Sequence, residues 1–521
     1  MIDVQTDVDF LRRLDRKLRR YTLHSKLEVF RKFSHATDPN LRNPALLQSF
    51  YPGHSQQYYE QIAKHIYLHE LAYLSLASVV AGEWDGPKAP LSTTKEIRSL
   101  VNSYRDYSPP FNHKNDAVLE EFSLRHFLVR VAMQQFIYQK NPVLDLYRYH
   151  FLFQFKSEEL DVPVLFHKAF QYSYDDYVTV ATVLYVISSQ STEPLRKADL
   201  EKIIGNITSF SPEKIQTMLD VLSMPRELAT TMYNKFRSTD ERMRVYDYNP
   251  MLMKPMIQEG ETLYLPIPLY LFSAITEGFY QMLCSKSKTF RANFGKYAYE
   301  SYIQHLLEES GITYIPEFEF TTKKQTWRSS DFMLVKGNDV ILVEVKANAP
   351  SVNLRHTDEE TYKQQLQKAH IKAIESCIKK DKLIQDGELT HSLLPTKIGR
   401  ISYLIVTLED HYFNDYETVT DMLAEKKLYL HDAQYHTMCT ATLESIIDSD
   451  QRDIFEFCHE CEDKGITYTH YAQTQVQKVT LPTVSKRRQY WRNKKATMTQ
   501  GVDSFLQQGK DGQVVHETSI K

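Results

Sequence analysis

Asp331, Glu344 and Lys346 are ionisable residues in a short stretch, "SSDFMLVKGNDVILVEVK", that otherwise predicts two apolar β-strands joined by a tight turn. If Gly337 and Asn338 form that turn, with glycine first as a type II′ turn requires, Asp331 lies directly opposite Glu344 on the neighbouring strand. Side chains alternate along a strand, so Lys346 projects from the same face as Glu344. The pattern therefore predicts two facing carboxylates with an ammonium group beside them.

Two facing carboxylates in an apolar sheet repel each other, and burying charge is unfavourable. We expect a divalent cation, Mg²⁺ or Mn²⁺, to resolve this conflict, because Mg²⁺ prefers oxygen ligands and leaves positions for water and a phosphate oxygen. Such a cation lowers the pKa of its bound water and offsets charge that develops on a phosphate. Lys346 could orient or help deprotonate the water, or hold the phosphate, and the sequence leaves these roles open.

The hairpin lies within an ordered series of predicted elements. A helix over about 289–309 precedes the strand "YIPEFEF", and the hairpin is followed by a helix over about 358–381 and the strand "ISYLIVT" at 401–407. The segments "FMLV" and "VILVEV" are apolar on both faces, which indicates central strands that are covered on both sides. The acids are therefore predicted to lie in the interior of a sheet.

An acid at the start of one strand, followed by Glu-x-Lys at the end of the next, resembles the restriction-endonuclease-like PD-(D/E)XK phosphodiesterase superfamily. The matching residues are Asp331, Glu344 and Lys346, with "SSD" in place of the Pro-Asp of the family name. The resemblance covers about 285–410 and, at its widest, 285–465. It implies an α/β nuclease core of helix, three strands, helix and strand, with a mixed central sheet flanked by helices, and a metal-dependent nuclease activity.

The resemblance also implies a third acid. Many members of the superfamily place a metal-supporting acid on the helix before the first strand, and Glu300 is the matching position. The implied metal ligands are then Asp331, Glu344 and Glu300. An ordinary helix-surface glutamate is the alternative for Glu300.

The segment "TYKQQLQKAH" resembles a Tyr-x-x-Gln element that some members carry after the Glu-x-Lys strand. It gives Tyr362, which would pack or stack, and Gln365, which would help to hold substrate phosphate or water. Lys368 is a nearby competitor for substrate contact, as are neighbouring glutamines.

The remainder of the chain predicts a large, mostly α-helical region before the nuclease core. Only 15 of 521 residues are glycine, which favours long helices over tight turns. We expect a helical sensor or substrate-positioning region at 1–240, a bridging segment at 241–284, the nuclease domain at 285–470 and a basic, flexible tail at 471–521. The stretch at 192–229 fits either a small helical recognition unit or ordinary helical packing.

Composition limits the environment and the partners. The formal net charge is -3, so a nucleic acid would have to be met by a local basic patch. Five scattered cysteines without a secretory signal predict reduced thiols in the cytoplasm, and no apolar run is long enough to cross a membrane.

The leading hypothesis is an endonuclease that cuts DNA or RNA, including transfer RNA. A solitary nuclease joined to a large helical region resembles bacterial anti-phage defence effectors, which implies an invader-derived trigger, for instance a protein. The rival hypothesis is a nuclease-fold protein that binds nucleic acid or a partner without cutting. The sequence leaves open the substrate, the cut-site preference, the trigger and the oligomeric state.

Overall fold

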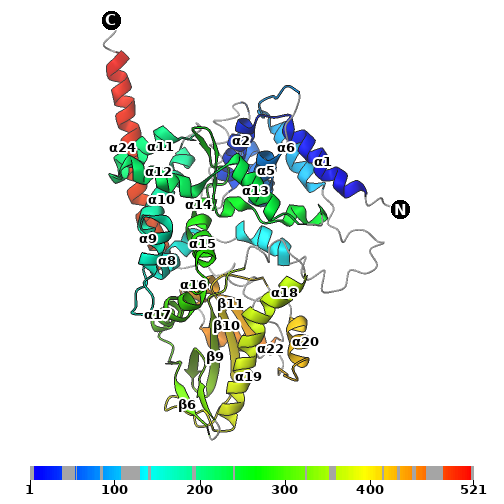
Figure 1. The fold of residues 1–521 in the computed structure, drawn as a ribbon, viewed down its shortest axis with the longest axis vertical. Coiled ribbons are helices and arrows are strands. Elements are labelled where there is room, and N and C mark those ends of the chain that lie inside the picture. Colours follow the sequence, from blue (N-terminus) through cyan, green and yellow to red (C-terminus); the bar gives the residue numbers. More distant parts are fainter. Residues whose placement is uncertain are drawn as a thin grey trace.

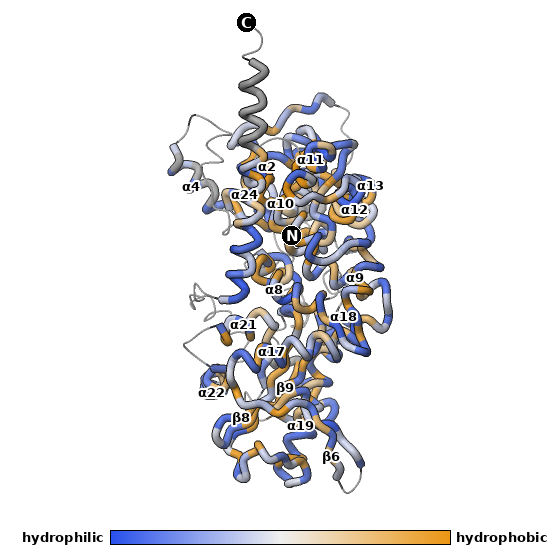
Figure 2. Tube along the Cα trace, turned by 90° about the vertical axis from the view of Figure 1, so that its left-hand side faces the viewer, coloured by the Kyte–Doolittle hydropathy of each residue, from blue (hydrophilic) through white to orange (hydrophobic). Residues whose placement is uncertain are grey.

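Helices dominate one end of the molecule and a mixed β-sheet the other, stacked along its longest axis (Figures 1 and 2). The computed structural model describes residues 5–37, 53, 55–81, 86–106, 129–138, 142–190, 195–238, 241–322, 325–350, 359–412, 416–430, 435–448, 453–464 and 485–517. No helix in these ranges combines the length and the apolar character that crossing a bilayer requires.

The helical part forms because amphipathic segments bury one face each. In the first helix Phe10, Leu14 and Leu18 are buried, at the spacing that places them on one face. The helices are α1 (Gln5–Arg19), α2 (Leu23–Thr37), α4 (Gln56–Lys64), α5 (Leu68–Val80), α6 (Thr94–Arg105), the 3₁₀ turn η2 (Phe136–Tyr138), α8 (Pro142–Phe153), α9 (Val162–Phe170), α10 (Tyr174–Gln190), α11 (Lys197–Thr208), α12 (Pro212–Leu222) and α13 (Arg226–Lys235). The expected helical character before residue 240 is therefore confirmed in the part that the structure describes.

A small sheet joins this helical part to the segment that follows it. Its strand order is β1-β4-β3-β2. The strands are β1 (Leu195–Arg196), β2 (Ser223–Pro225), β3 (Met256–Glu259) and β4 (Thr262–Tyr264), and the helical elements of the segment are η3 (Glu241–Tyr246), η4 (Pro250–Leu252), α14 (Tyr270–Ser273), the π-helical η5 (Ala274–Gly278) and α15 (Phe279–Lys286). The expected bridging segment contains a hairpin of β3 and β4, which completes a sheet with the earlier strands β1 and β2 and so belongs to the helical part.

The α/β part follows the expected order of helix, strands, helix and strand. Its elements are α16 (Phe290–Asn293), the π-helical η6 (Phe294–Tyr299), α17 (Glu300–Ser310), β5 (Tyr314–Pro316), β6 (Glu319–Thr321), β7 (Thr326–Arg328), β8 (Phe332–Lys336), β9 (Asp339–Lys346), α18 (Glu359–Leu366), the π-helical η8 (Gln367–Ile371), α19 (Lys372–Gln385), β10 (Ile401–Thr407), α20 (Tyr416–Ala424), β11 (Tyr435–Cys439), α21 (Thr440–Ile447) and α22 (Ile454–Asp463). The sheet order is β11-β10-β9-β8-β5. Strands β9, β10 and β11 are parallel, whereas β8 is antiparallel to β9 and to β5, so the sheet is mixed.

Strand β9 is central and is covered on both faces. Ile341 and Val343 belong to the same apolar cluster as the helical part, whereas Val340 and Leu342 pack with α18 and α19. Because side chains alternate along a strand, Glu344 lies on the same face as Leu342, under α19. The prediction of a doubly covered strand is confirmed, and it places the acid beneath a helix.

The C-terminal segment forms a long helix, α24 (Lys486–Glu517), instead of the flexible tail expected from the sequence. It packs along α8 and α10, as Figure 1 shows. Trp491 forms edge contacts with Tyr185 and Phe272, and Tyr490 lies against His150. The expectation of a flexible tail is therefore wrong for this helix, because its aromatic side chains pack against the helical part. Residues 465–484 and 518–521 lie outside the described ranges.

Candidate functional site

The hairpin has the register that the sequence predicts. Val335 pairs with Val340, and Lys336 pairs with Asp339, across a turn in which Gly337 has a φ of 62°. The positive φ explains why glycine occupies the first turn position. Extending this register by one pair beyond β8 brings Asp331 opposite Glu344.

The two carboxylates converge on one ammonium group. The Lys346 Nζ lies 2.9 Å from the Glu344 Oε2 and 3.7 Å from the Asp331 Oδ2. The Asp331 Oδ2 also accepts a hydrogen bond of 2.7 Å from the backbone N–H of Val345. The predicted pair therefore lies on one side of the sheet, largely removed from solvent, with side-chain exposures of 14% for Asp331 and 6% for Glu344.

A second lysine, which the sequence reasoning missed, completes the cluster. Lys380 extends from α19, and its Nζ donates to the Glu344 Oε1 at 2.7 Å. Two ammonium groups thus offset two carboxylates, so the expectation that only a divalent cation could balance this charge is wrong. Lys380 is three residues after the buried Cys377 and four before the buried Ile384, so it lies on the apolar face of α19. A lysine at that spacing was the signal that could have identified it.

Charge and burial shift the pKa values of Asp331 and Glu344 in opposite directions. Burial alone would raise the pKa of Glu344, but Lys346 and Lys380 outweigh it, so this pKa is lowered. Burial and the negative charge of Glu344 raise the pKa of Asp331. Burial would lower the pKa of Lys346, yet the two carboxylates raise it. Lys346 is therefore an ammonium group at neutral pH and is suited to donating hydrogen bonds.

Glu300 lies close enough to Asp331 for the charge of Asp331 to raise the pKa of Glu300. Burial, and then Asp331, raise the pKa of Glu300 to about 7, although Lys296 lies 3.0 Å away and opposes the shift. Glu300 opens α17, and the preceding turn passes close to the end of β9, where a Cβ on Gly295 would lie 3.2 Å from the Ala347 Cβ. Glycine permits this close approach, which positions the third acid beside the hairpin.

The Tyr-x-x-Gln element lies on α18, and its members differ in exposure. Tyr362 is fully buried in the apolar cluster between the sheet and α19, so of its two expected roles it packs. Gln365 is partly exposed and Lys368 is exposed. Within the described residues neither side chain forms a hydrogen bond with the acid pair of the hairpin. The structure therefore supplies no contact that supports a role for Gln365 or Lys368 in the site.

The acid pair suits a hard divalent cation in its donor chemistry. In the ranges that the structure covers, no group of three or more His, Cys, Asp and Glu side chains is arranged to hold a metal ion, so Glu300 is not gathered with Asp331 and Glu344. Mg²⁺ is commonly bound through one or two carboxylates, with water and substrate phosphate completing its shell. Asp331 and Glu344 alone therefore fit such an ion.

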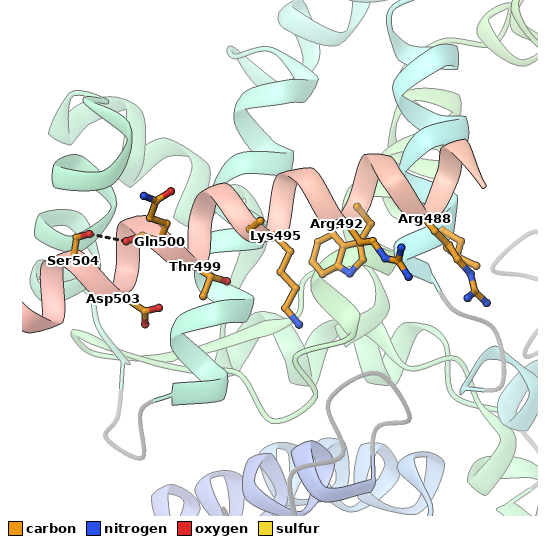
Figure 3. A pocket seen from close by; sticks show the side chains of 10 residues that line it. Arg488, Arg492, Lys495, Thr499, Gln500, Asp503 and Ser504 are labelled. Atoms are coloured by element: carbon orange, nitrogen blue, oxygen red, sulfur yellow. Dashed lines mark hydrogen bonds between the residues drawn. The ribbon is translucent and has the colours of Figure 1, made fainter. Parts of the chain in front are cut away.

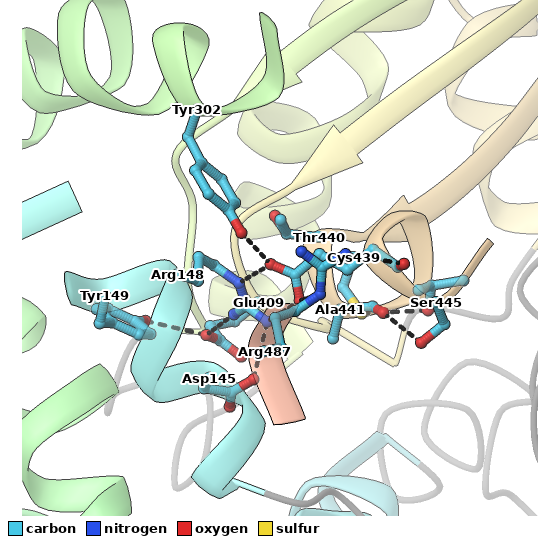
Figure 4. Close-up of polar contacts among 12 residues, drawn as sticks. Asp145, Arg148, Tyr149, Tyr302, Glu409, Cys439, Thr440, Ala441, Ser445 and Arg487 are labelled. Atoms are coloured by element: carbon cyan, nitrogen blue, oxygen red, sulfur yellow. Dashed lines mark hydrogen bonds and ion pairs between the residues drawn. The ribbon is translucent and has the colours of Figure 1, made fainter. Parts of the chain in front are cut away.

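A second buried ionic cluster joins the two parts of the molecule. Arg148 of α8 is fully buried and lies 2.8 Å from the Asp145 carboxylate, 3.0 Å from Glu409 and 2.9 Å from Glu444. Tyr302 of α17 donates to Glu444 at 2.7 Å. Figure 4 shows Arg148, Glu409 and Tyr302 gathered between α8 and the α/β part. The cluster fixes the helical part to the helices that flank the sheet.

Comparison with models of known protein families and with curated protein sequences finds no match for this chain. Its function therefore has to be argued from the site itself.

Proposed function

We propose that this protein is a divalent-metal-dependent endonuclease of the PD-(D/E)XK type. The observation that carries the proposal is the convergence of Asp331 and Glu344 on Lys346 at the end of a buried hairpin. Paired acids with pKa values shifted in opposite directions are typical of sites that do acid–base or metal chemistry.

Each residue then has a role. Asp331 and Glu344 would hold Mg²⁺ or Mn²⁺, with Glu300 supporting from α17. When bound, the ion supplies charge stabilisation for the phosphate and a more acidic water. Lys346 is protonated, so it would donate to a phosphate oxygen or orient the water, and removal of the water's proton would fall to another group. Lys380 would neutralise Glu344 and compete with the ion for that carboxylate.

A basic groove beside α24 offers a local surface for a polyanion. Arg488, Arg492 and Lys495 project from one side of the helix, as Figure 3 shows. Trp491 also lines the groove. Because phosphate contacts are supplied mainly by Arg and Lys, this groove supports a nucleic acid as the substrate. It does not distinguish DNA from RNA or transfer RNA.

The helical part is proposed to detect an invader-derived trigger and to restrain or direct the nuclease. This proposal rests on the analogy with bacterial anti-phage defence effectors, which act in the cytoplasm, and on the size of the helical part. The buried Arg148 cluster supports it, because a fixed joint could transmit a change in the helices to the sheet.

A non-catalytic nucleic-acid- or partner-binding protein is the second candidate. The observation that favours it is the neutralisation of both acids by Lys346 and Lys380, since a balanced ion cluster can serve packing alone. Such a protein would bind nucleic acid without cutting it.

Incubation of the full-length protein with plasmid, linear DNA, total RNA and transfer RNA, with and without Mg²⁺ or Mn²⁺, tests the proposal. We expect metal-dependent cleavage of at least one substrate, and its loss in Asp331→Asn and Glu344→Gln. Glu319→Gln is the matched control, because that side chain is 66% exposed in the small β6–β7 hairpin.

Cleavage that persists in Asp331→Asn or Glu344→Gln would reject the site. Binding without cleavage by the wild-type chain under all conditions would favour the non-catalytic candidate.

A further inference from the structure

The groove beside α24 follows one side of the helix from Arg488 to Ser504, and Leu144 of α8 also lines it. Its volume is about 980 Å³. Each helical residue adds about 1.5 Å, so this side of α24 extends for roughly 24 Å. A surface of that length suits a polymer better than a small ion or a single nucleotide.

The basic residues near the start of α24 divide into two groups. Lys486, Arg487 and Lys494 form ion pairs with carboxylates that lie on or directly after α17, α21 and α10. The Arg487 side chain is only 3% exposed. These three cations hold the helix against the rest of the protein, so they are not available to a ligand.

The second group consists of Arg488 and Lys495, which line the groove and are partly exposed. Within the residues that the structure describes, neither side chain forms a hydrogen bond or an ion pair. Arg492 and Asp503 also line the groove, but each interacts with other groups of the protein and is therefore left out of this count. The groove thus presents two cations that no described carboxylate pairs with.

Arg488 and Lys495 are spaced to contact a phosphate backbone. They lie seven positions apart in the helix, which corresponds to about 10 Å along its axis. Figure 3 shows both side chains on the same side of α24 as Thr499. A nucleic-acid duplex carries one phosphate charge per roughly 1.7 Å of its axis. Both cations can therefore meet a phosphate in any register, and the Thr499 hydroxyl adds a neutral donor.

The groove has no row of aromatic rings. Among the described residues that line it, Trp491 is the only aromatic one, and its ring makes edge contacts with Tyr185 and Phe272. Proteins that bind single strands stack successive bases on several such rings. A duplex, by contrast, can be held through backbone contacts that read no sequence. The lining of the groove therefore favours a duplex.

We propose that this groove binds the phosphate backbone of a double-stranded nucleic acid without sequence preference. The inference rests on the proposed function for the kind of polymer, and it adds the form in which that polymer is held. Duplex DNA and duplex RNA share the backbone charge that the groove recognises, so both enter the test.

Fluorescence anisotropy of the full-length protein, without divalent metal so that no cleavage takes place, measures this binding. The probes are DNA and RNA duplexes of about 20 base pairs, which exceed the length of the groove at roughly 3.4 Å per base pair. Each duplex is used in two unrelated sequences and is compared with its single strands. We expect at least one type of duplex to bind at least tenfold more tightly than its single strands, with equal affinity for its two sequences.

Substitutions on α24 locate the binding. Arg488→Ala and Lys495→Ala should each weaken duplex binding about five- to tenfold at ~0.1 M salt, because each removes one phosphate contact. Each should also lower the slope of log affinity against log salt concentration by about one. Lys494→Ala is the matched control, because Lys494 neighbours Lys495 but pairs with Asp175 and does not line the groove. It should leave the slope unchanged.

Tighter binding of duplex DNA, duplex RNA or both supports the proposal and identifies the polymer. The proposal is overturned if single strands bind as tightly as duplexes, if one sequence is preferred, or if no duplex binds at up to ~100 μM protein. Affinity and salt slope that stay unchanged in folded Arg488→Ala and Lys495→Ala proteins would overturn it as well.

The nuclease proposal can fail separately, because cleavage enters none of these measurements. A protein that binds duplexes through the groove but cuts no substrate in the presence of metal would contradict only the nuclease proposal. Metal-dependent cleavage together with unchanged binding by Arg488→Ala and Lys495→Ala would contradict only the role of the groove.

Discussion

The two buried ionic clusters of this molecule balance charge in different ways. Around Arg148, burial opposes ionisation, but the surrounding carboxylates raise the arginine's pKa, and Arg148 and Arg487 lower the pKa of Glu444. The pKa shifts of Arg148 and Glu444 both favour the charged form. Around the hairpin, the pKa of Glu344 is lowered while those of Asp331 and Glu300 are raised. The Arg148 cluster therefore pairs charges that stabilise each other, whereas the hairpin cluster brings together acids whose pKa values are shifted in opposite directions.

This difference separates stability from function. A buried ion pair whose partners are all satisfied resists change, because removing either partner leaves an uncompensated charge. A set of acids with opposed pKa shifts stores repulsion that a cation or a phosphate-bound metal would relieve. Changes in the Arg148 cluster should therefore affect unfolding, and changes in the hairpin cluster should affect chemistry.

Asp331→Asn should produce the largest change in activity and leave the fold intact. We expect cleavage to fall about a thousandfold, equivalent to ~4 kcal/mol of transition-state stabilisation lost with a metal ligand. Removing a charge that repels Glu344 should leave the urea midpoint unchanged or raised. A lower urea midpoint with normal cleavage would contradict this prediction, because it would show that the hairpin cluster stabilises the fold and is not needed for cleavage.

Arg148→Met should produce the largest change in stability. Losing the cation would leave Glu409 and Glu444 without their shared partner, so we expect the free energy of unfolding to fall by about 3–5 kcal/mol. Thermal and urea denaturation measure this loss, with Arg328→Met as control because that side chain is 61% exposed. Equal effects of Arg148→Met and Arg328→Met would show that the Arg148 cluster contributes little to the free energy of unfolding.

Glu300→Gln should change the pH dependence of stability. Burial, and then Asp331, raise the Glu300 pKa to about 7 from its ordinary 4.5, so the folded state holds this proton more tightly than the unfolded chain. The resulting stability is fully present below pH 4.5 and is lost as the pH rises through 7, by about 3 kcal/mol. Urea midpoints at pH 5 and pH 8 should differ less in the variant. An unaltered pH dependence would contradict the buried position of Glu300.

Lys380→Gln should have the smallest effect. Because Lys346 continues to neutralise Glu344, we expect a loss of about 1 kcal/mol in stability and tighter binding of a divalent cation. The adjacent Lys379 is exposed on α19, and Lys379→Gln is the control. Weaker metal binding in Lys380→Gln than in the control would show that this lysine organises the acid and does not compete with the metal.

The hairpin could be predicted from sequence because its geometry is local. One glycine-first turn sets the register of β8 and β9, and strand alternation then fixes the faces of Glu344 and Lys346. The strand at 401–407 was also predictable, since an apolar run of that length between polar segments favours a buried strand.

The long-range contacts were not predictable in the same way. Lys380 was one of several lysines on its helix, and only the packing of α19 on β9 directs it to Glu344. The partners of Arg148 are more than 250 residues away at Glu409 and Glu444, a distance over which composition carries no information. The packing of α24 could not be predicted from its basic composition. Trp491 is covered only because Tyr185 of α10 and Phe272 of α14 lie against it.

Titration of the full-length protein with Mn²⁺, followed by the loss of the free-ion electron paramagnetic resonance signal, tests the acid pair most directly. The wild-type chain should bind Mn²⁺ and release it to excess Mg²⁺. Glu344→Gln should weaken binding more than the roughly 10–100-fold expected for losing an outer contact of a metal site. Equal Mn²⁺ affinity in the two proteins, or no binding by the wild-type chain, would contradict a metal site at Asp331 and Glu344.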